Sequence, residues 1–223
     1  MRFYCFSEKR SFFQIFQDFP GIKLPLEYLF EAIPRIQPRS FSISSAQQAK
    51  PGEAHVTLAV VQYTTRMGRI RKGLCSNFLA SLNSQGSLTC VDQVDFIEKP
   101  LVPIQITPGF TRLPNDPNIP VIMVGPGTGC AIFRSFLQQR QVLKSKGTSV
   151  GPAAFFFGCR HQEKDYLHKE DWEELVSQGI LQVFDPAFSR DQKQKIYVQH
   201  KIKQHSKVLW EYIQKGAFIY VSG

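Results

Sequence analysis

A glycine-rich turn, GPGTG at residues 125–129, is the segment of this sequence with the clearest chemical potential. It follows a short, wholly apolar run at residues 119–124, which is typical of a strand buried on both faces, and it precedes a helical pattern. Glycine allows close backbone approach to a ligand, and a helix N-terminus presents unpaired N–H groups to an anion. The passage therefore indicates a phosphate- or dinucleotide-binding turn, with tight strand–helix packing as the alternative.

A second group of chemically capable residues lies between residues 185 and 199. Ser189, Arg190 and Lys195 could hold a 2′-phosphate, and Tyr197 could cover an adenine ring. A site for the dinucleotide without that phosphate usually offers a carboxylate to the ribose hydroxyl. The carboxylates in this stretch are Asp185 and Asp191. The residues favour NADPH over NADH without deciding between them.

Two segments of the first half also suggest ligand contacts. In PRSFSISS, Arg39 could pair with a phosphate, Phe41 could stack on a planar ring and Ser42 could hydrogen-bond to that ring. Residues 73–76 (GLCS) open a helix-like stretch over residues 77–82, which makes a second helix N-terminus available to an anion. Ordinary strand and capping interactions explain either segment when it is taken alone.

Two domains must position these residues. Residues 11–35 predict short helical turns, because prolines at 20, 25 and 34 interrupt a helical pattern. Short β-branched segments separated by glycine and proline, notably at residues 55–63 and 91–106, predict an antiparallel barrel over residues 36–115. The first predicted domain is therefore 1–115, with residues 1–35 as the end of a helical connecting region.

The second predicted domain, residues 116–223, alternates strands with helices. Apolar runs at 119–124, 153–158, 181–184 and 217–221 are expected to be strands, and each of the first three is followed by a helical pattern. The last of these patterns predicts one long helix over residues 194–215, with Gly216 as its C-terminal cap. This alternation predicts an α/β fold with a parallel sheet.

The charge distribution and the cysteine content indicate which classes of protein this sequence does not fit. The chain carries 27 basic and 18 acidic residues, a net charge of +9, and the excess is spread over both halves. One basic concentration, at residues 190–207, is either the solvated face of a helix or a phosphate pocket. Five cysteines without a C-x-x-C pair argue against a disulfide framework or a zinc site. We expect a cytoplasmic protein, since there is no secretory signal and no apolar run of the ~20 residues that a membrane span needs.

Six motifs occur in the order found in the ferredoxin–NADP reductase-like module of diflavin reductases, and the sequence therefore resembles that family. They are PRSFSISS, GLCSNFL, VIMVGPGTG followed by IFRSF, FFFGCR, AFSRDQKQKIYVQHKI and GAFIYVSG. The group includes cytochrome P450 reductase, and this sequence is most similar to the branch that serves cytosolic iron–sulfur assembly. The resemblance covers residues 9–223. It implies a β-barrel FAD-binding domain followed by an α/β parallel-sheet NADPH-binding domain.

The resemblance also implies site residues and an electron route. For FAD it implies Lys9, Arg39, Ser40, Phe41, Ser42, Gly73, Leu74, Cys75 and Ser76. For NADPH it implies Gly125, Gly127, Thr128, Gly129, Ser189, Arg190, Lys195, Ile196, Tyr197, Val198 and Gln199. Ser42 would lie near flavin N5 and is the catalytic candidate, and no metal is expected. Electrons would pass from NADPH to FAD, then to FMN and an anamorsin-type iron–sulfur protein.

The sequence departs from the family at three positions and at both ends. Ala131-Ile132 stands where the family has Ala-Pro, Ser222 where P450-reductase-type relatives carry a cysteine, and Lys9 where an arginine is expected. No FMN-binding domain precedes residue 1, and the family's terminal helix and aromatic residue are not found after Gly223. We therefore expect a module truncated at both ends, with a C-terminally incomplete NADPH-binding domain.

Functions from different classes follow from these observations. The leading expectation is an NADPH-dependent flavoprotein oxidoreductase. The alternatives are a truncated, non-catalytic protein that binds a partner, or the module of another diflavin reductase such as cytochrome P450 reductase. Binding to nucleic acid is a distant third, because the chain lacks a recognisable reader motif.

Overall fold

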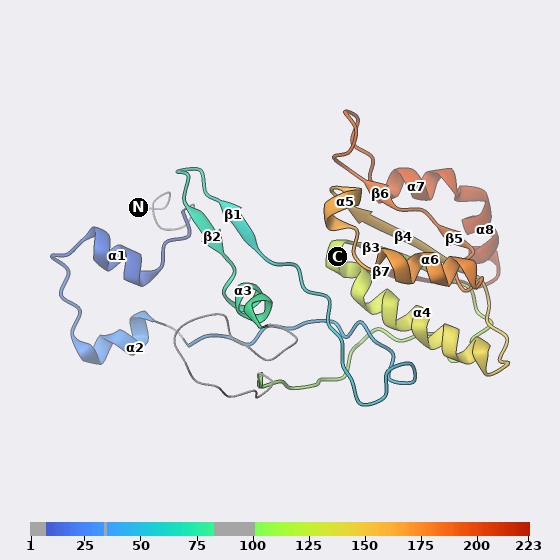
Figure 1. Ribbon diagram of the computed structural model, residues 1–223, viewed down its shortest axis with the longest axis horizontal. Coiled ribbons are helices and arrows are strands. Elements are labelled where there is room, and N and C mark those ends of the chain that lie inside the picture. The colour runs from blue at the N-terminus through green and yellow to red at the C-terminus, as the bar shows by residue number, and fades with distance from the viewer. Residues whose placement is uncertain (1–7, 34, 83–100) are drawn as a thin grey trace. The chain divides into compact units, whose positions relative to one another are not determined.

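The computed structural model describes residues 8–33, 35–82 and 101–223, and the chain divides into two compact units (Figure 1). The first unit comprises Met1–Ser40 and Ala59–Ile104, and the second comprises Phe41–Leu58 and Gln105–Gly223. Each unit is described by itself below. The segment of residues 41–58 belongs to the second unit, although the residues just before and just after it in the chain belong to the first.

Short helices form the N-terminal part of the first unit, as predicted. Helix α1 spans Phe12–Asp18, a 3₁₀ turn spans Leu26–Tyr28 and α2 spans Leu29–Ala32. Ser11 caps α1: its hydroxyl accepts from the N–H of Gln14, whose side chain in turn accepts from the N–H of Ser11. Such a capping box begins a helix efficiently, and the prolines that follow keep each helix short.

An antiparallel hairpin and one helix complete the described part of the first unit. Strand β1, Gln62–Thr64, pairs with β2, Ile70–Lys72, and Gly68 takes a positive φ of 80° in the turn between them. Helix α3 spans Leu74–Ser81, with Gly73 at its N-cap. It therefore begins three residues earlier than the predicted stretch of residues 77–82.

The predicted barrel is not closed in the described residues. They contain the β1–β2 hairpin and an isolated antiparallel bridge between Ile43 and Val56. The predicted strand over 55–63 is therefore paired only at Val56 and from Gln62 onward. Residues 101–106 form no strand, and residues 91–100 lie outside the described part of the chain. β-Branched composition favours a pleated surface, but a strand also needs a hydrogen-bonded neighbour.

A parallel sheet forms the centre of the second unit, as predicted, and it has five strands where four were expected. Its order is β5-β4-β3-β7, and β6 pairs with β4 beyond the end of β5. The strands are β3 (Val121–Pro126), β4 (Ala153–Cys159), β5 (Val183–Phe184), β6 (Ala187–Phe188) and β7 (Phe218–Val221). The helices are α4 (Cys130–Ser145), α5 (Gln162–Asp165), α6 (Lys169–Ser177), α7 (Val198–Gln204) and α8 (Ser206–Gln214).

Helices cover both faces of this sheet (Figure 1). Alternate residues of β3 and β4 point to opposite faces, so each face has its own apolar cluster. The first cluster joins Val121, Met123, Phe155 and Phe157 to Phe133 and Leu137 of α4 and Trp172 of α6. The second joins Ile122, Ala154 and Phe156 to Leu209 and Tyr212 of α8, with Val198 and Ile202 of α7 packed against it. The two-sided core explains why both central strands are wholly apolar.

Two predicted elements of this unit were wrong in detail. The strand expected at 181–184 is shortened to β5, and a further short strand, β6, which was not predicted, follows Pro186, a residue that cannot donate to a ladder. The helix expected over 194–215 begins only at Val198 and is interrupted at His205. The imidazole of His205 bonds to Asp185 after β5 at 3.0 Å, which fixes the junction between α7 and α8.

Two general findings limit the chemistry of the described residues. None of their helices is both long enough and apolar enough to cross a membrane. Within the same residues, no three side chains of histidine, cysteine, aspartate or glutamate come together as a metal site.

Candidate functional site

The glycine turn follows the end of β3 and leads directly into α4. Gly127 takes a positive φ of 57° with no atom within 4 Å of the position of a Cβ, and Thr128 beside it is exposed. Gly127–Gly129 form a 3₁₀ turn that runs directly into the 16-residue helix α4, and the N–H of Cys130 donates to the carbonyls of Gly127 and Thr128. The N–H groups without an intrahelical partner and the positive dipole end therefore lie at the glycine turn itself. The open backbone at Gly127 and the exposed hydroxyl of Thr128 fit a pyrophosphate group.

Glycines also bring the carboxyl ends of three strands close together. A Cβ on Gly129 would fall on the carbonyl oxygen of Ser222, which follows β7. A Cβ on Gly158, in β4, would lie 2.8 Å from Cγ1 of Val198, the first residue of α7. The glycine turn, the end of β7 and the start of α7 therefore meet at the edge of a parallel sheet where ligands usually bind.

The predicted phosphate residues lie at the same edge. The N–H groups of Ser189 and Arg190 donate to the carbonyls of Cys159 and Arg160, at 2.9 Å in both cases, which continues the pairing of β6 with β4. The Ser189 hydroxyl donates to the Cys159 carbonyl at 3.3 Å, and the Arg190 side chain is exposed. The sheet thus fixes the backbone of both residues and leaves the guanidinium accessible.

Residues 191–197 form an exposed connection from β6 to α7, which extends away from the sheet in Figure 1. Lys195 is exposed on it, Ile196 is half-buried, and Gln199 is exposed in the first turn of α7. The Tyr197 ring is 42% exposed and stacks on His200, with 6.1 Å between ring centroids. The N–H of Tyr197 donates to Nδ1 of His200, which fixes the start of α7 and leaves an aromatic face available.

Both carboxylates near this loop are engaged by the chain itself. Asp185 contacts Nζ of Lys201 at 2.8 Å and the imidazole of His205. Asp191 accepts from the N–H of Gln162 and contacts Nδ1 of His161, both at 2.9 Å. These two hydrogen bonds, the Gln162 bond first, lower the pKa of Asp191. Both carboxylates are thus already held by contacts within the chain.

The residues expected to bind FAD are divided between the two units. Phe41, 37% exposed, and the exposed Ser42 lie in the second unit with the NADPH candidates. Arg39 and Ser40 belong to the first unit, where the Arg39 guanidinium donates to the carbonyl of Gln37. The segment of residues 41–58 is closed by the Ile43–Val56 bridge and by the Ser44 N–H, which donates to the His55 carbonyl at 2.7 Å.

The other FAD candidates lie around β2 and α3 of the first unit. The Arg71 side chain in β2 donates to the carbonyl of Glu8, next to Lys9, at 2.8 and 3.2 Å. Gly73, just after β2, is the N-cap of α3, where Leu74 is exposed and Cys75 is a half-buried free thiol. The hydroxyl of Ser76 accepts from the N–H of Val61 at 3.0 Å and is buried. Ser76 thus supports the turn, and the open N-terminus of α3 is available to an anion.

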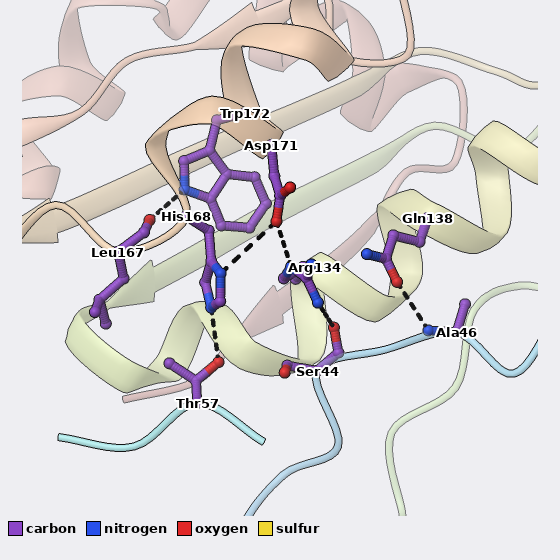
Figure 2. A network of polar contacts seen from close by, with 9 residues as sticks. All are labelled: Ser44, Ala46, Thr57, Arg134, Gln138, Leu167, His168, Asp171 and Trp172. Carbon is purple, nitrogen blue, oxygen red and sulfur yellow. Dashed lines mark hydrogen bonds and ion pairs between the residues drawn. The ribbon is translucent and has the colours of Figure 1, made fainter. Parts of the chain in front are cut away.

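A polar network in the second unit contains residues that the sequence analysis did not select (Figure 2). Arg134 contacts Asp171 at 2.5 Å and donates to the Ser44 carbonyl at 2.9 Å. His168 contacts the hydroxyl of Thr57 at 2.9 Å and lies 3.7 Å from Asp171. The available signal was the arginine within the apolar helical pattern of residues 132–137, because a charged residue there needs a partner.

The pKa of His168 gives a testable pH dependence. Burial lowers the pKa below its ordinary value of 6.5, and the charge of Arg134 lowers it further, against the opposing effects of Asp171 and Glu170. The folded protein therefore takes up this proton less readily than the unfolded chain. The stabilising contribution of neutral His168 is fully present above pH 6.5 and is lost as the pH falls through the folded-state pKa.

We expect the free energy of unfolding, from urea denaturation, to fall between about pH 7.5 and about pH 5.5 by more in the wild-type chain than in His168→Asn. Asparagine is the matched replacement because residue 168 has a positive φ of 58°, which asparagine tolerates. An equal loss in both proteins would show that another group causes the dependence.

The two described thiols of the second unit are unreactive. Burial raises the pKa of Cys130 to about 12 and that of Cys159 to about 11, with Asp165 and Asp191 adding to the second shift. Thiolate is the reactive form of cysteine, so neither residue provides a nucleophile at neutral pH.

Comparison with known proteins agrees with this geometry. Residues 3–78 match the family model of the FAD binding domain, and residues 123–223 match that of the oxidoreductase NAD-binding domain. The chain is 40% identical to NADPH-dependent diflavin oxidoreductase 1 of Dictyostelium discoideum, over 100% of this chain and 35% of that protein. It is 42% identical to the protein of the same name from Xenopus laevis, over 99% and 34% respectively.

A second kind of relative is similar over the same part of the chain. The human NADPH–cytochrome P450 reductase is 39% identical over 96% of this chain and 31% of its own length. The chain thus spans about a third of the length of the curated relatives it matches. It is therefore homologous, over nearly its whole length, to one segment of the proteins named NADPH-dependent diflavin oxidoreductase 1 and NADPH–cytochrome P450 reductase, and it matches the family models of an FAD binding domain and an oxidoreductase NAD-binding domain.

Proposed function

We propose that this chain is the module of a diflavin oxidoreductase that passes hydride from NADPH to FAD. The observation that carries the proposal is the meeting of the glycine turn, the Ser189–Arg190 pair and the Tyr197 loop at the carboxyl edge of one parallel sheet. The matches to an FAD binding domain and an oxidoreductase NAD-binding domain support the two cofactors. When bound, NADPH supplies a hydride and FAD accepts it.

The chain's own residues bind and orient the nicotinamide cofactor. The backbone at Gly127 and Gly129, with the hydroxyl of Thr128, receives the pyrophosphate at the start of α4. Gly125 allows close packing there, since a Cβ on it would lie 2.7 Å from the Phe133 ring. The start of α7, with Val198 and Gln199, borders the adenosine end.

Arg190 and Lys195 hold the 2′-phosphate in this proposal, with Ser189 beside them and Tyr197 covering the adenine. The engagement of Asp185 with Lys201 and of Asp191 with Gln162 supports this choice, because a site for NADH needs a carboxylate free for the ribose. The sequence left these alternatives open, and the contacts of the two carboxylates favour NADPH.

For FAD we propose two sets of residues. Arg39, Ser40, Phe41 and Ser42 contact the flavin and its phosphates, with Ser42 at the flavin ring, where the hydride arrives. Lys9 and the N-terminus of α3, with Gly73, Leu74, Cys75 and Ser76, bind the pyrophosphate. Phe41 and Ser42 are exposed, as a ring-stacking and a hydrogen-bonding residue must be before the ligand binds.

The proposal extends to the domain boundaries, the electron acceptor and the location of the whole protein. We infer a barrel-type FAD-binding domain within residues 1–115 and an NADPH-binding domain over 116–223. Electrons then pass to an FMN domain and to an anamorsin-type iron–sulfur acceptor in the cytoplasm. The relatives named as diflavin oxidoreductases support this route.

Flavin content and electron transfer test the proposal directly. We expect the purified 223-residue chain to bind FAD with a protein-bound flavin spectrum, and to reduce ferricyanide with NADPH in preference to NADH. NADH supplied at the same concentration is the internal control for the 2′-phosphate. A folded chain that neither binds flavin nor reduces ferricyanide would overturn the proposal and favour a partner-binding role.

A further inference from the structure

The segment of residues 41–58 is fastened to α4 by two side chains one helical turn apart (Figure 2). Arg134 donates to the Ser44 carbonyl at 2.9 Å, and the side-chain oxygen of Gln138 accepts from the Ala46 N–H at 3.0 Å. Both bonds reach the backbone of the first part of this segment, just after Ser42; we call this part, residues 43–46, the outgoing limb, and the part that contains Thr57 the returning limb. Residues at i and i+4 share one helix face, so a single face of α4 holds the outgoing limb.

The returning limb of the segment is held from α6. His168, immediately before α6, contacts the Thr57 hydroxyl at 2.9 Å, and Asp171 in its first turn binds Arg134 at 2.5 Å. Trp172 in the same turn donates its indole N–H to the Leu167 carbonyl at 2.7 Å, which orders the approach to α6. We call Arg134, Gln138, His168 and Asp171 the clamp, since they hold both limbs.

Arg134 is the residue on which the clamp depends. Its side chain is 11% exposed and bonds to Asp171 on α6 and to the Ser44 carbonyl at once. A guanidinium can serve two acceptors in fixed directions, whereas a lysine ammonium concentrates its charge at one point. Charge-assisted hydrogen bonds of low exposure are about twice as strong as neutral ones. Arg134 therefore links α4, α6 and the segment in one contact.

The position of α4 gives this clamp a function. The helix begins at the glycine turn, and Ser42 lies two residues before Ser44. We propose that Arg134 is a positioning residue for hydride transfer: through Ser44 it holds the segment that carries Ser42 on the helix whose N-terminus receives the nicotinamide cofactor. This inference rests on the proposed function. Reacting atoms must approach to about 3–3.5 Å, and a displacement of about 1 Å can cost about 100-fold in rate.

Hydrogen exchange tests the clamp without any cofactor. In Arg134→Met we expect the amides of residues 41–58, above all Ala46, to exchange at least about tenfold faster, and in Arg134→Lys by a smaller factor. Gln138→Leu should release Ala46, whereas Gln138→Glu keeps an acceptor and should not. Lys144→Met is the control on the same helix, because Lys144 bonds to the carbonyls of Gln178 and Gly179 instead.

Flavin reduction tests the positioning role in the same proteins after they are loaded with FAD. We expect single-turnover reduction by NADPH to slow about 10- to 100-fold in Arg134→Met. FAD content and KM for NADPH should stay unchanged, with partial recovery in Arg134→Lys and the wild-type rate in Lys144→Met. Unchanged exchange over residues 41–58 in both Arg134→Met and Gln138→Leu would overturn the clamp.

The remaining outcomes separate this inference from the proposed function. Faster exchange with an unchanged rate of flavin reduction would overturn the positioning role and leave the proposed function intact. A wild-type chain that NADPH does not reduce would instead refute the proposed function, and with it the role in hydride transfer. The exchange experiment would still decide whether Arg134 holds the segment.

Discussion

Replacing Gly129 with alanine is expected to lower the affinity for NADP⁺ about 10- to 100-fold and the free energy of unfolding by about 1–3 kcal/mol. The new methyl group would fall on the carbonyl oxygen of Ser222. This neighbour is backbone held in the sheet, because the Ser222 N–H donates to the Val124 carbonyl at 3.0 Å. Either β7 or the start of α4 must therefore move, and both border the pyrophosphate position.

Equilibrium binding of NADP⁺ and urea denaturation measure these two effects. The matched control is Gly109→Ala, since Gly109 has no atom within 4 Å of an added Cβ and no positive φ. That variant should stay within about 0.5 kcal/mol of the wild-type stability and keep its affinity. Wild-type affinity in Gly129→Ala would contradict the placement of the nucleotide at this turn.

The double replacement of Arg190 and Lys195 by alanine is expected to weaken binding of 2′,5′-ADP at least about 100-fold and to leave binding of 5′-AMP almost unchanged. Hydrogen bonds to charged groups contribute about 1.5–3 kcal/mol each, and two of them are lost. The two ligands differ only in the 2′-phosphate, so calorimetric titration of both isolates the contribution of that group. The fold should be retained, because both side chains are exposed.

A second double variant controls for overall charge. Lys203→Ala with Lys207→Ala removes the same two charges from exposed positions of α7 and α8. Long-range effects of such charges are largely screened at physiological salt, so we expect a change of less than about threefold for 2′,5′-ADP. An equal loss in the two double variants would mean that general positive charge, rather than a specific pocket, attracts the ligand.

Local patterns predicted the elements that bear the glycine turn. An apolar run followed by glycines and a helical pattern produced β3, the turn and α4, with the strand ending two residues later than expected. The parallel sheet was predicted for the same reason, since runs buried on both faces alternate with amphipathic helices. Such signals depend on near neighbours in the chain, so they can be read without the fold.

Elements that depend on distant contacts were predicted less well. The interruption at His205 depends on a bond to Asp185, twenty residues earlier in the chain. Of residues 55–63, only 62 and 63 pair with β2, because a ladder forms only where a neighbouring strand lies alongside. The sequence of residues 55–63 does not encode where that neighbour lies. The clamp was missed because Arg134, in its apolar helical pattern, signals only that a partner is needed, whereas Asp171 and Ser44 are brought to it by the fold from 37 and 90 residues away in the chain.

The sequence by itself determined the glycine turn, the two-sided apolar strands and the order of the motifs that resemble those of diflavin reductases. Only the tertiary structure decided which groups are free to act. Asp185 and Asp191 are already engaged, Arg190 is accessible, and the segment carrying Ser42 is fastened to α4 through Ser44. The reason is physical: residue type and spacing specify local conformation, whereas the partners of a charged or polar side chain depend on which distant segments the fold packs against it.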